Sequence, residues 1–143
     1  MSVEFTFDGL DELKQALMDL PASLSQEGGD IVVVATNDTA DAIVAAYPEG
    51  PTGHLKGGVR FTVERSPFGA LGTIKNTAQH AWIFEEGTQA RHYVTKNGVQ
   101  HLTGSMPPSH VFVRTIMAGR KTMYEQLSDL LKAQGLEVSD DGA

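Results

Sequence analysis

Five histidines and one pair of adjacent glutamates are the side chains of this sequence best suited to acid–base or metal chemistry. The histidines stand at positions 54, 80, 92, 101 and 110, and none is four residues from another, as two ligands on one helix face would be. His92 and His101 flank an Asn-Gly turn and could face each other across a hairpin, where one carboxylate would complete a zinc site. Ordinary loop and strand histidines explain this spacing better. We therefore expect no metal and no cofactor.

The adjacent glutamates are equally poor candidates for catalysis. Glu85 and Glu86 follow His80, but neighbouring residues of a strand point to opposite faces and cannot serve one reaction centre. An exposed sheet edge suits them better. The glycine-rich segment at 53–58 lacks the GxxxxGK[ST] spacing of a phosphate-binding loop. The chain is expected not to be an enzyme, with a small metal-dependent hydrolase as the alternative.

Length and composition predict one soluble domain spanning residues 1–143. The chain has no cysteine, which excludes disulfides, thiolate metal ligands and a cysteine nucleophile. Acidic residues near the N-terminus do not resemble a signal peptide. The apolar run at 31–35 is far shorter than the roughly 20 residues that span a bilayer. No membrane partner is expected.

Charge is unevenly distributed along the chain. Residues 1–50 carry ten acids and one base, residues 51–121 carry nine bases and three acids, and residues 122–143 carry five acids and one base. These blocks could form an ordinary mixed surface. Alternatively, acidic and basic faces of neighbouring copies meet head to tail, or the basic middle faces nucleic acid.

The first third of the chain, residues 1–50, is predicted to be a short strand followed by acidic helices. Residues 3–7 alternate as a half-buried strand does, and leucines recur at spacings of three and four from Leu10 to Leu24. Pro21 should bend this helix, and Gly28-Gly29 suggests a break. The segment that ends at Tyr47 has helical spacing, although the run at 31–34 could equally be a buried strand; the alanine-rich continuation and Pro48 favour a helix.

Residues 51–106 are predicted to form one antiparallel sheet. Runs at 59–64 and 70–76 surround a turn at 66–69, a third strand is expected at 81–85, and Asn97-Gly98 is a strong hairpin signal. An excursion at 86–105 should project from this sheet as a loop or hairpin. A last helix is predicted from Pro107-Pro108 to about residue 134, and residues 139–143 are expected to be flexible.

The predicted fold class is therefore α+β, an antiparallel sheet packed against two or more helices with a long projecting loop or hairpin. Trp82 and Phe84 would lie on one face of the third strand, either as a core aromatic pair or as an interface anchor.

Three segments carry a resemblance to a known family. They are Pro51-Thr52-Gly53-His54-Leu55-Lys56-Gly57, then Ala81-Trp82-Ile83-Phe84-Glu85-Glu86-Gly87-Thr88, then Met106-Pro107-Pro108-Ser109-His110-Val111-Phe112 leading into a helix. Their order and spacing over about residues 30–134 resemble the HK97-gp10-like family of bacteriophage neck, or tail-completion, proteins. The landmark residues are Thr52, Gly53, Leu55, Trp82, Glu85, Gly87, Thr88 and Pro107. His80-Ala81-Trp82 departs from the tyrosine-alanine pair usual there, and 110–113 departs from a plainer Pro-Phe-Leu.

The resemblance implies a structural protein of the virion, without catalytic residues, assembled in the host cytoplasm. Copies would form a homo-oligomeric ring where the DNA-filled head joins the tail, in contact with other neck, connector and tail proteins. Genomic DNA would pass through the ring. A tail terminator, a ring protein that caps the tail tube, is the alternative within the same class.

The excursion at 86–105 is the predicted interaction site. It is long for a connection within a compact domain, and such segments are commonly functional. Its candidate contact residues are Gly87, Thr88, Arg91, His92, Lys96 and His101, which are basic or lie at its base. They suit either an acidic face of a neighbouring copy or DNA.

Overall fold

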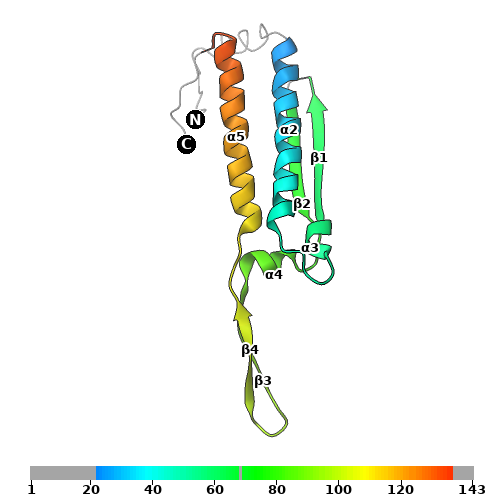
Figure 1. Cartoon of the computed structure of the whole chain (residues 1–143), viewed down its shortest axis with the longest axis vertical. Helices are drawn as coiled ribbons and strands as arrows, with labels where there is room; N and C mark the ends of the chain where they lie inside the picture. The colour runs from blue at the N-terminus through cyan, green and yellow to red at the C-terminus, as the bar shows by residue number, and fades with distance from the viewer. Residues whose placement is uncertain (1–21, 68, 137–143) are drawn as a thin grey trace, which may run out of the picture.

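The computed structural model describes residues 22–67 and 69–136, and shows an elongated α+β arrangement (Figure 1). Two long helices lie side by side, a two-stranded sheet packs beside one of them, and a second two-stranded hairpin extends away from their lower end. The elements are α2 (Ala22–Ala46), α3 (His54–Gly57), β1 (Val59–Ser66), β2 (Gly69–Asn76), α4 (Ala81–Glu86), β3 (Thr88–Val94), β4 (Gln100–Met106) and α5 (Val111–Ala133). The predicted strand at 3–7 and the leucine stripe from Leu10 to Leu20 lie outside the described residues.

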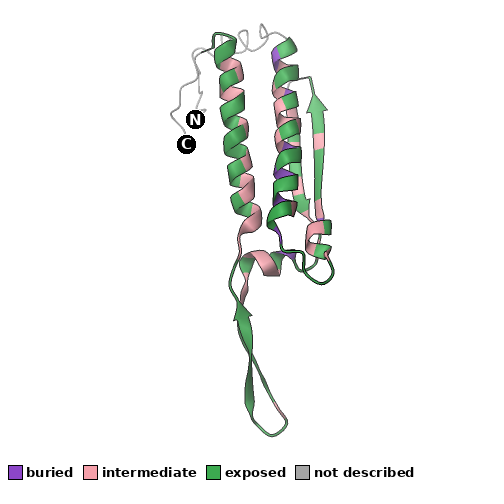
Figure 2. Ribbon diagram, in the orientation of Figure 1, coloured by how far each residue is buried: buried purple, intermediate pink, exposed green. Residues whose placement is uncertain are grey.

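Helix α2 is the middle layer, with α5 on one side and the β1–β2 sheet on the other. Its inward face supplies most of the buried side chains among the described residues (Figure 2). Buried hydrophobic residues are Leu24, Ala40, Ile43, Tyr47 and Ala81, and the buried polar ones are Thr36 and Thr39. Helix α5 has no fully buried residue. The core is therefore thin and centred on one helix.

Close backbone approaches explain several glycines. A Cβ atom on Gly72 of β2 would collide with Thr36, and one on Gly119 of α5 would collide with Thr39. Gly119, which weakens the sequence signal for the last helix, is thus a point where α5 passes close to α2. The predicted break at Gly28-Gly29 is wrong, because α2 runs through both residues. Packing of α5 and the sheet on either side of α2 outweighs the low helix propensity of glycine.

The helix predicted before Pro48 is confirmed, since α2 extends to Ala46, and the strand alternative for its first residues is wrong. The β1–β2 hairpin is confirmed, with Phe61 opposite Ile74 and Val63 opposite Gly72. Its outward side chains, such as Arg60, Thr62 and Glu64, are exposed, as expected for a sheet with one packed face.

Three predictions for the sheet and for the helices that follow it need correction. The single sheet is wrong, because β1–β2 and β3–β4 form two separate sheets. The strand at 81–85 is wrong, because α4 occupies those residues; a short apolar run cannot distinguish helix from strand by its pattern. The last helix begins at Val111 rather than at Pro107, after His110 in a left-handed conformation (φ 51°). Its end near Gly135 is confirmed.

Replacing two helical glycines by alanine should have opposite effects on stability. Gly28→Ala should raise the free energy of unfolding by about 0.5–1 kcal/mol, since alanine favours helix and the new Cβ would only touch Leu127 at 3.7 Å. Gly119→Ala should lower it by about 1–3 kcal/mol, because the collision with Thr39 exceeds the same propensity gain. Urea denaturation measures both.

Thr39→Ala in the Gly119→Ala background is the control, because it removes the colliding hydroxyl and should recover part of the loss. Equal stabilisation by Gly28→Ala and Gly119→Ala would contradict the close passage of α5 over α2.

Candidate interaction site

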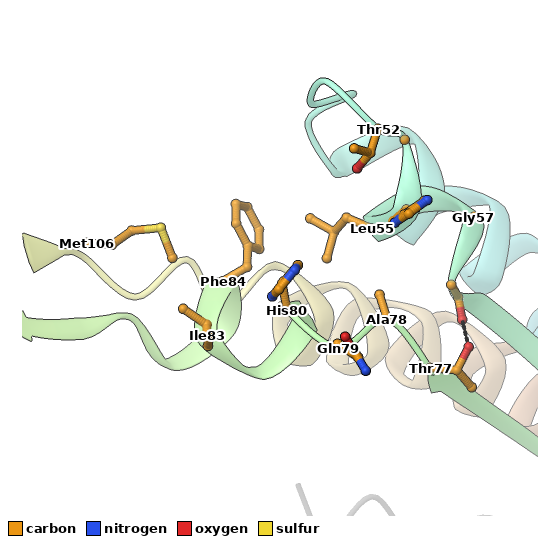
Figure 3. A pocket seen from close by; sticks show the side chains of 13 residues that line it. Thr52, Leu55, Gly57, Thr77, Ala78, Gln79, His80, Ile83, Phe84 and Met106 are labelled. Carbon is orange, nitrogen blue, oxygen red and sulfur yellow. Dashed lines mark hydrogen bonds between the residues drawn. The ribbon is translucent and has the colours of Figure 1, made fainter.

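The landmark segments meet at one place, the junction between the helical body and the β3–β4 hairpin. Thr52, Gly53 and Leu55 line one side of an open hollow of about 870 Å³, and α4 and the end of β4 line the other (Figure 3). Gly53 has φ 63°, a conformation that favours glycine, and its carbonyl accepts the Gly57 N–H in α3. The hollow contains mostly apolar and backbone groups, with His54 and His80 at its walls.

Helix α4 anchors the junction to the core. Ala81 is buried, and the Phe84 ring meets the Tyr47 ring edge to face at 5.6 Å between centroids. Trp82 is 66% exposed, so the interpretation of Trp82 and Phe84 as a core pair on one face is wrong. In a helix these positions lie on opposite sides, and only Phe84 packs inward. Trp82 is thereby free for contact with a partner.

Glu85 links α4 to the start of α5. Both of its carboxylate oxygens accept the backbone N–H of Phe112, at 3.2 and 3.1 Å. A carboxylate at a helix N-terminus satisfies an otherwise unpaired amide and interacts favourably with the helix dipole. The carbonyl of Glu85 also accepts the N–H groups of Ser109 and His110. The expected exposed sheet edge is therefore wrong, and Glu85 holds α5 against α4.

Gly87 lets the chain leave α4 and enter the hairpin. Its backbone, φ 74° and ψ −171°, lies in a region essentially restricted to glycine. A Cβ atom there would lie 2.5 Å from the Met106 carbonyl oxygen, 2.7 Å from the Pro108 nitrogen and 2.9 Å from the Pro107 carbonyl carbon. The next residue, Thr88, pairs with Met106 and accepts its N–H through Oγ1. Three of the landmark residues, Gly87, Thr88 and Pro107, thus fix the base of the hairpin.

The excursion at 86–105 is a hairpin, one of the two forms expected for it, and the Asn-Gly signal is confirmed. Thr95 donates its N–H to the Val99 carbonyl, and Gly98 (φ 77°) completes the turn. Tyr93 pairs with His101 and their rings stack at 5.2 Å, whereas His92 pairs with Leu102. His92 and His101 therefore lie on opposite faces, and the hypothesis that they face each other across the hairpin is wrong.

Nothing in the described residues covers the hairpin. Every residue of β4, and every residue of β3 after Thr88, is exposed (Figure 2), including Tyr93 at 54% and Leu102 at 80%. Residues 88–106 carry Arg91 and Lys96 and no acid. An isolated two-stranded hairpin is marginally stable in water. Exposed apolar side chains on both faces of such a hairpin indicate a surface for a partner.

Two further features bear on the chemistry of the site. In residues 22–67 and 69–136, no group of three or more histidine, aspartate or glutamate side chains is placed to bind a metal. Among the same residues, no helix is long and apolar enough to cross a bilayer.

Comparison of the chain with family models, with curated proteins and with solved structures finds no match. The geometry and the resemblance of the three landmark segments are therefore the observations that bear on function.

Some important residues were not among the sequence candidates. Tyr93 and Leu102 belong to the hairpin that Asn97-Gly98 predicts, and strand alternation around that turn would have identified them as partners on its two faces. Tyr47 is 2% exposed and belongs to the core next to the junction. No sequence signal distinguishes it from the other apolar positions of the helix before Pro48.

Gly87→Ala should disrupt the junction. The new Cβ would press on backbone atoms of 106–108, which cannot move independently, so we expect a loss of about 3 kcal/mol or more in the free energy of unfolding. Chemical denaturation followed by the fluorescence of the single tryptophan, Trp82 in α4, measures this change beside the site.

The matched control is Gly98→Ala at the tip of the hairpin. Gly98 also has a positive φ, but its Cβ would meet nothing within 4 Å, so only about 1–2 kcal/mol of local strain is expected. Equal effects of the two substitutions would show that the crowding at Gly87 is absent.

Tyr47 provides a test at alkaline pH. Burial is the main cause that raises its pKa to about 12; the Asn76 side chain acts in the opposite direction, and the Glu85 carboxylate adds to the rise. A phenol with a raised pKa in the folded state stabilises the protein fully below pH 10, and this contribution disappears as pH rises toward 12. Between pH 10 and 12 the natural protein should therefore lose about 2–3 kcal/mol more than Tyr47→Phe.

Urea denaturation of both proteins at several pH values measures this difference. At pH 7, Tyr47→Phe should be neutral or slightly stabilising, because the buried Tyr47 hydroxyl has no hydrogen-bond partner in the described residues. Parallel loss of stability in the two proteins above pH 10 would contradict the burial of the hydroxyl.

Proposed function

We propose that this protein is a structural subunit of a bacteriophage virion, forming a homo-oligomeric ring at the junction of head and tail. The proposal assigns it no catalytic residue and no cofactor. Its partners would be further copies of itself and the neighbouring neck, connector and tail proteins, with genomic DNA passing through the ring. Its location would be the neck or tail of the virion, after assembly in the host cytoplasm.

One observation carries the proposal: the three segments that resemble the phage family, separated by tens of residues in sequence, come together at the base of an exposed hairpin. There they perform one task. Gly53 and Leu55 shape the hollow, Glu85 holds the start of α5, and Gly87 sets the exit of the hairpin. Such a junction supports a rigid projection, which is what a ring subunit needs to reach its neighbour.

The thin core supports assembly as well. Val113, Met117 and Tyr124 of α5 are exposed in addition to the apolar residues of the hairpin. Contiguous exposed apolar surface is typical of proteins that bury it against other chains. A subunit that gains part of its buried surface from neighbours is consistent with a ring.

A tail terminator ring is the alternative position for the same kind of subunit. Electron microscopy of particles assembled without this protein distinguishes the two. Full heads beside separate, complete tails support the neck position, whereas tails of irregular length support the terminator. Normal virions would contradict both.

Shortening the hairpin tests its role directly. Replacing residues 89–105 by an Asn-Gly turn keeps the Thr88 and Met106 pair at the junction. Because the removed residues are exposed, the melting temperature should change little. Complementation of a phage that lacks the native copy should fail.

Substitution of Thr62, Thr73 and Lys75 by alanine is the control, because these exposed positions on the β1–β2 hairpin carry no proposed contact. It should leave complementation intact. Full complementation by the shortened protein would show that the β3–β4 hairpin is dispensable.

A further inference from the structure

An acidic stripe runs along the exposed face of α2. Glu27, Asp30, Asp38 and Asp41 recur at helical spacing around the central Val34, and α2 contains no lysine or arginine. Arg65 donates to Asp30, and this is the one ion pair within residues 22–67 and 69–136. The other three acids therefore have no basic partner there. Val34, although apolar, is 54% exposed in the middle of the stripe.

The β3–β4 hairpin has the complementary character. Tyr93 and His101 share one face of the hairpin. Arg91 precedes Tyr93 by two residues in β3, with an irregularity in the strand pairing between Arg91 and His92, and Lys96 lies in the turn at the tip. Along the chain, the hairpin thus carries one cation on either side of an exposed aromatic ring, whereas the stripe on α2 presents acids on either side of an exposed valine.

The spacings of the two surfaces also agree. In the hairpin, Arg91 is about 7 Å from Tyr93 along β3, at about 3.3 Å per residue, and Lys96 lies beyond the other end of this strand, in the turn. On α2, Val34 is about 6 Å from Asp38 and about 10 Å from Glu27, at about 1.5 Å per residue. With Tyr93 over Val34, Arg91 falls opposite Asp38, and Lys96 lies on the side of Glu27.

The hairpin cannot make this contact within its own chain. It extends away from the lower end of both long helices, so the face of its own α2 is out of reach (Figure 1). We propose that the β3–β4 hairpin of one copy docks along the acidic stripe of α2 in the next copy, with Tyr93 against Val34. This deepens the ring function proposed above and rests on it. Because the two surfaces differ, the contact is head to tail and repeats from copy to copy.

Charge reversal with mixing tests the proposal. One variant carries Arg91→Glu and Lys96→Glu, and the other carries Glu27→Lys and Asp38→Lys; all four residues are exposed, so both variants should melt as the natural protein does. Each alone should self-associate about tenfold or more weakly, as measured by light scattering over a concentration series. An equimolar mixture should recover association, because each hairpin then finds an α2 of opposite charge.

Crosslinking gives an independent measurement that keeps Tyr93, Val34 and the four charged residues of the proposed contact. The chain has no cysteine, so His101→Cys beside Tyr93 and Asn37→Cys beside Val34 can be made in separate proteins and mixed with a short bismaleimide. A covalent dimer of one chain of each kind is expected. Thr62→Cys, equally exposed but on β1, replaces Asn37→Cys as the control and should give none.

Each outcome separates the docking contact from the ring. Self-association that ignores both charge reversals, or no crosslink to Asn37→Cys, overturns the docking contact while the ring proposal stands. If the mixture recovers association and the crosslink forms, but electron microscopy shows open filaments, the docking contact is supported and the ring is contradicted. Loss of DNA retention in Arg91→Glu with Lys96→Glu, with self-association unchanged, assigns the hairpin to nucleic acid and overturns the contact. A chain that stays monomeric and uncrosslinked at every concentration contradicts both.

Discussion

The packing of α2 between two other elements is the constraint on which the rest of this structure depends. Without α2, α5 and the β1–β2 sheet have no common surface, because each packs on a different side of that helix. The contacts are close: Thr36 meets Gly72 on the sheet side, and Thr39 meets Gly119 on the other. Side chains this small let backbones approach but bury little apolar area. The result is a defined arrangement with a narrow core.

The junction uses a different kind of interaction, hydrogen bonding between helix ends. Glu85 belongs to α4 but satisfies the Phe112 amide of α5, while the α4 carbonyls accept the N–H groups of Ser109 and His110. These bonds fix α4 relative to α5, and Phe84 fixes α4 relative to Tyr47 of the core. The backbone conformation of Gly87 then sets the direction in which the hairpin leaves α4. Core packing thus positions α4, and α4 positions the hairpin.

The sequence predicted elements with strong periodicity or strong turn chemistry and failed where tertiary contacts decide. Alternation around residues 66–69 and the Asn97-Gly98 turn identified both hairpins, and Pro48 marked the end of α2. The α4 segment was mistaken for a strand because its helical form depends on partners at 109–112 that lie more than twenty residues away. The break at Gly28-Gly29 was predicted for the same reason, since no local pattern reveals the neighbouring elements that hold this helix together.

The candidate site was predictable in composition but not in geometry. The basic residues of 86–105 and the three landmark segments could be selected from the sequence. Their convergence at the base of one hairpin could not, because it depends on the path from α3 through β1 and β2 back to α4. The placement of His92 and His101 on opposite faces of the hairpin also depends on the strand register, because a slip of one residue moves a side chain to the other face.

The hairpin has a structural consequence that concerns protein solubility. Within residues 22–67 and 69–136, each of its strands has one hydrogen-bonded neighbour, so in this part of the chain both outer edges display unpaired backbone groups that could recruit another strand. Two such hairpins meeting through their β3 edges would bring Arg91 of both chains near each other, with no acid in residues 88–106 to offset the repulsion. The same cations that suit an acidic surface therefore discourage hairpins from stacking on one another, which protects the free subunit from growing into β-rich aggregates.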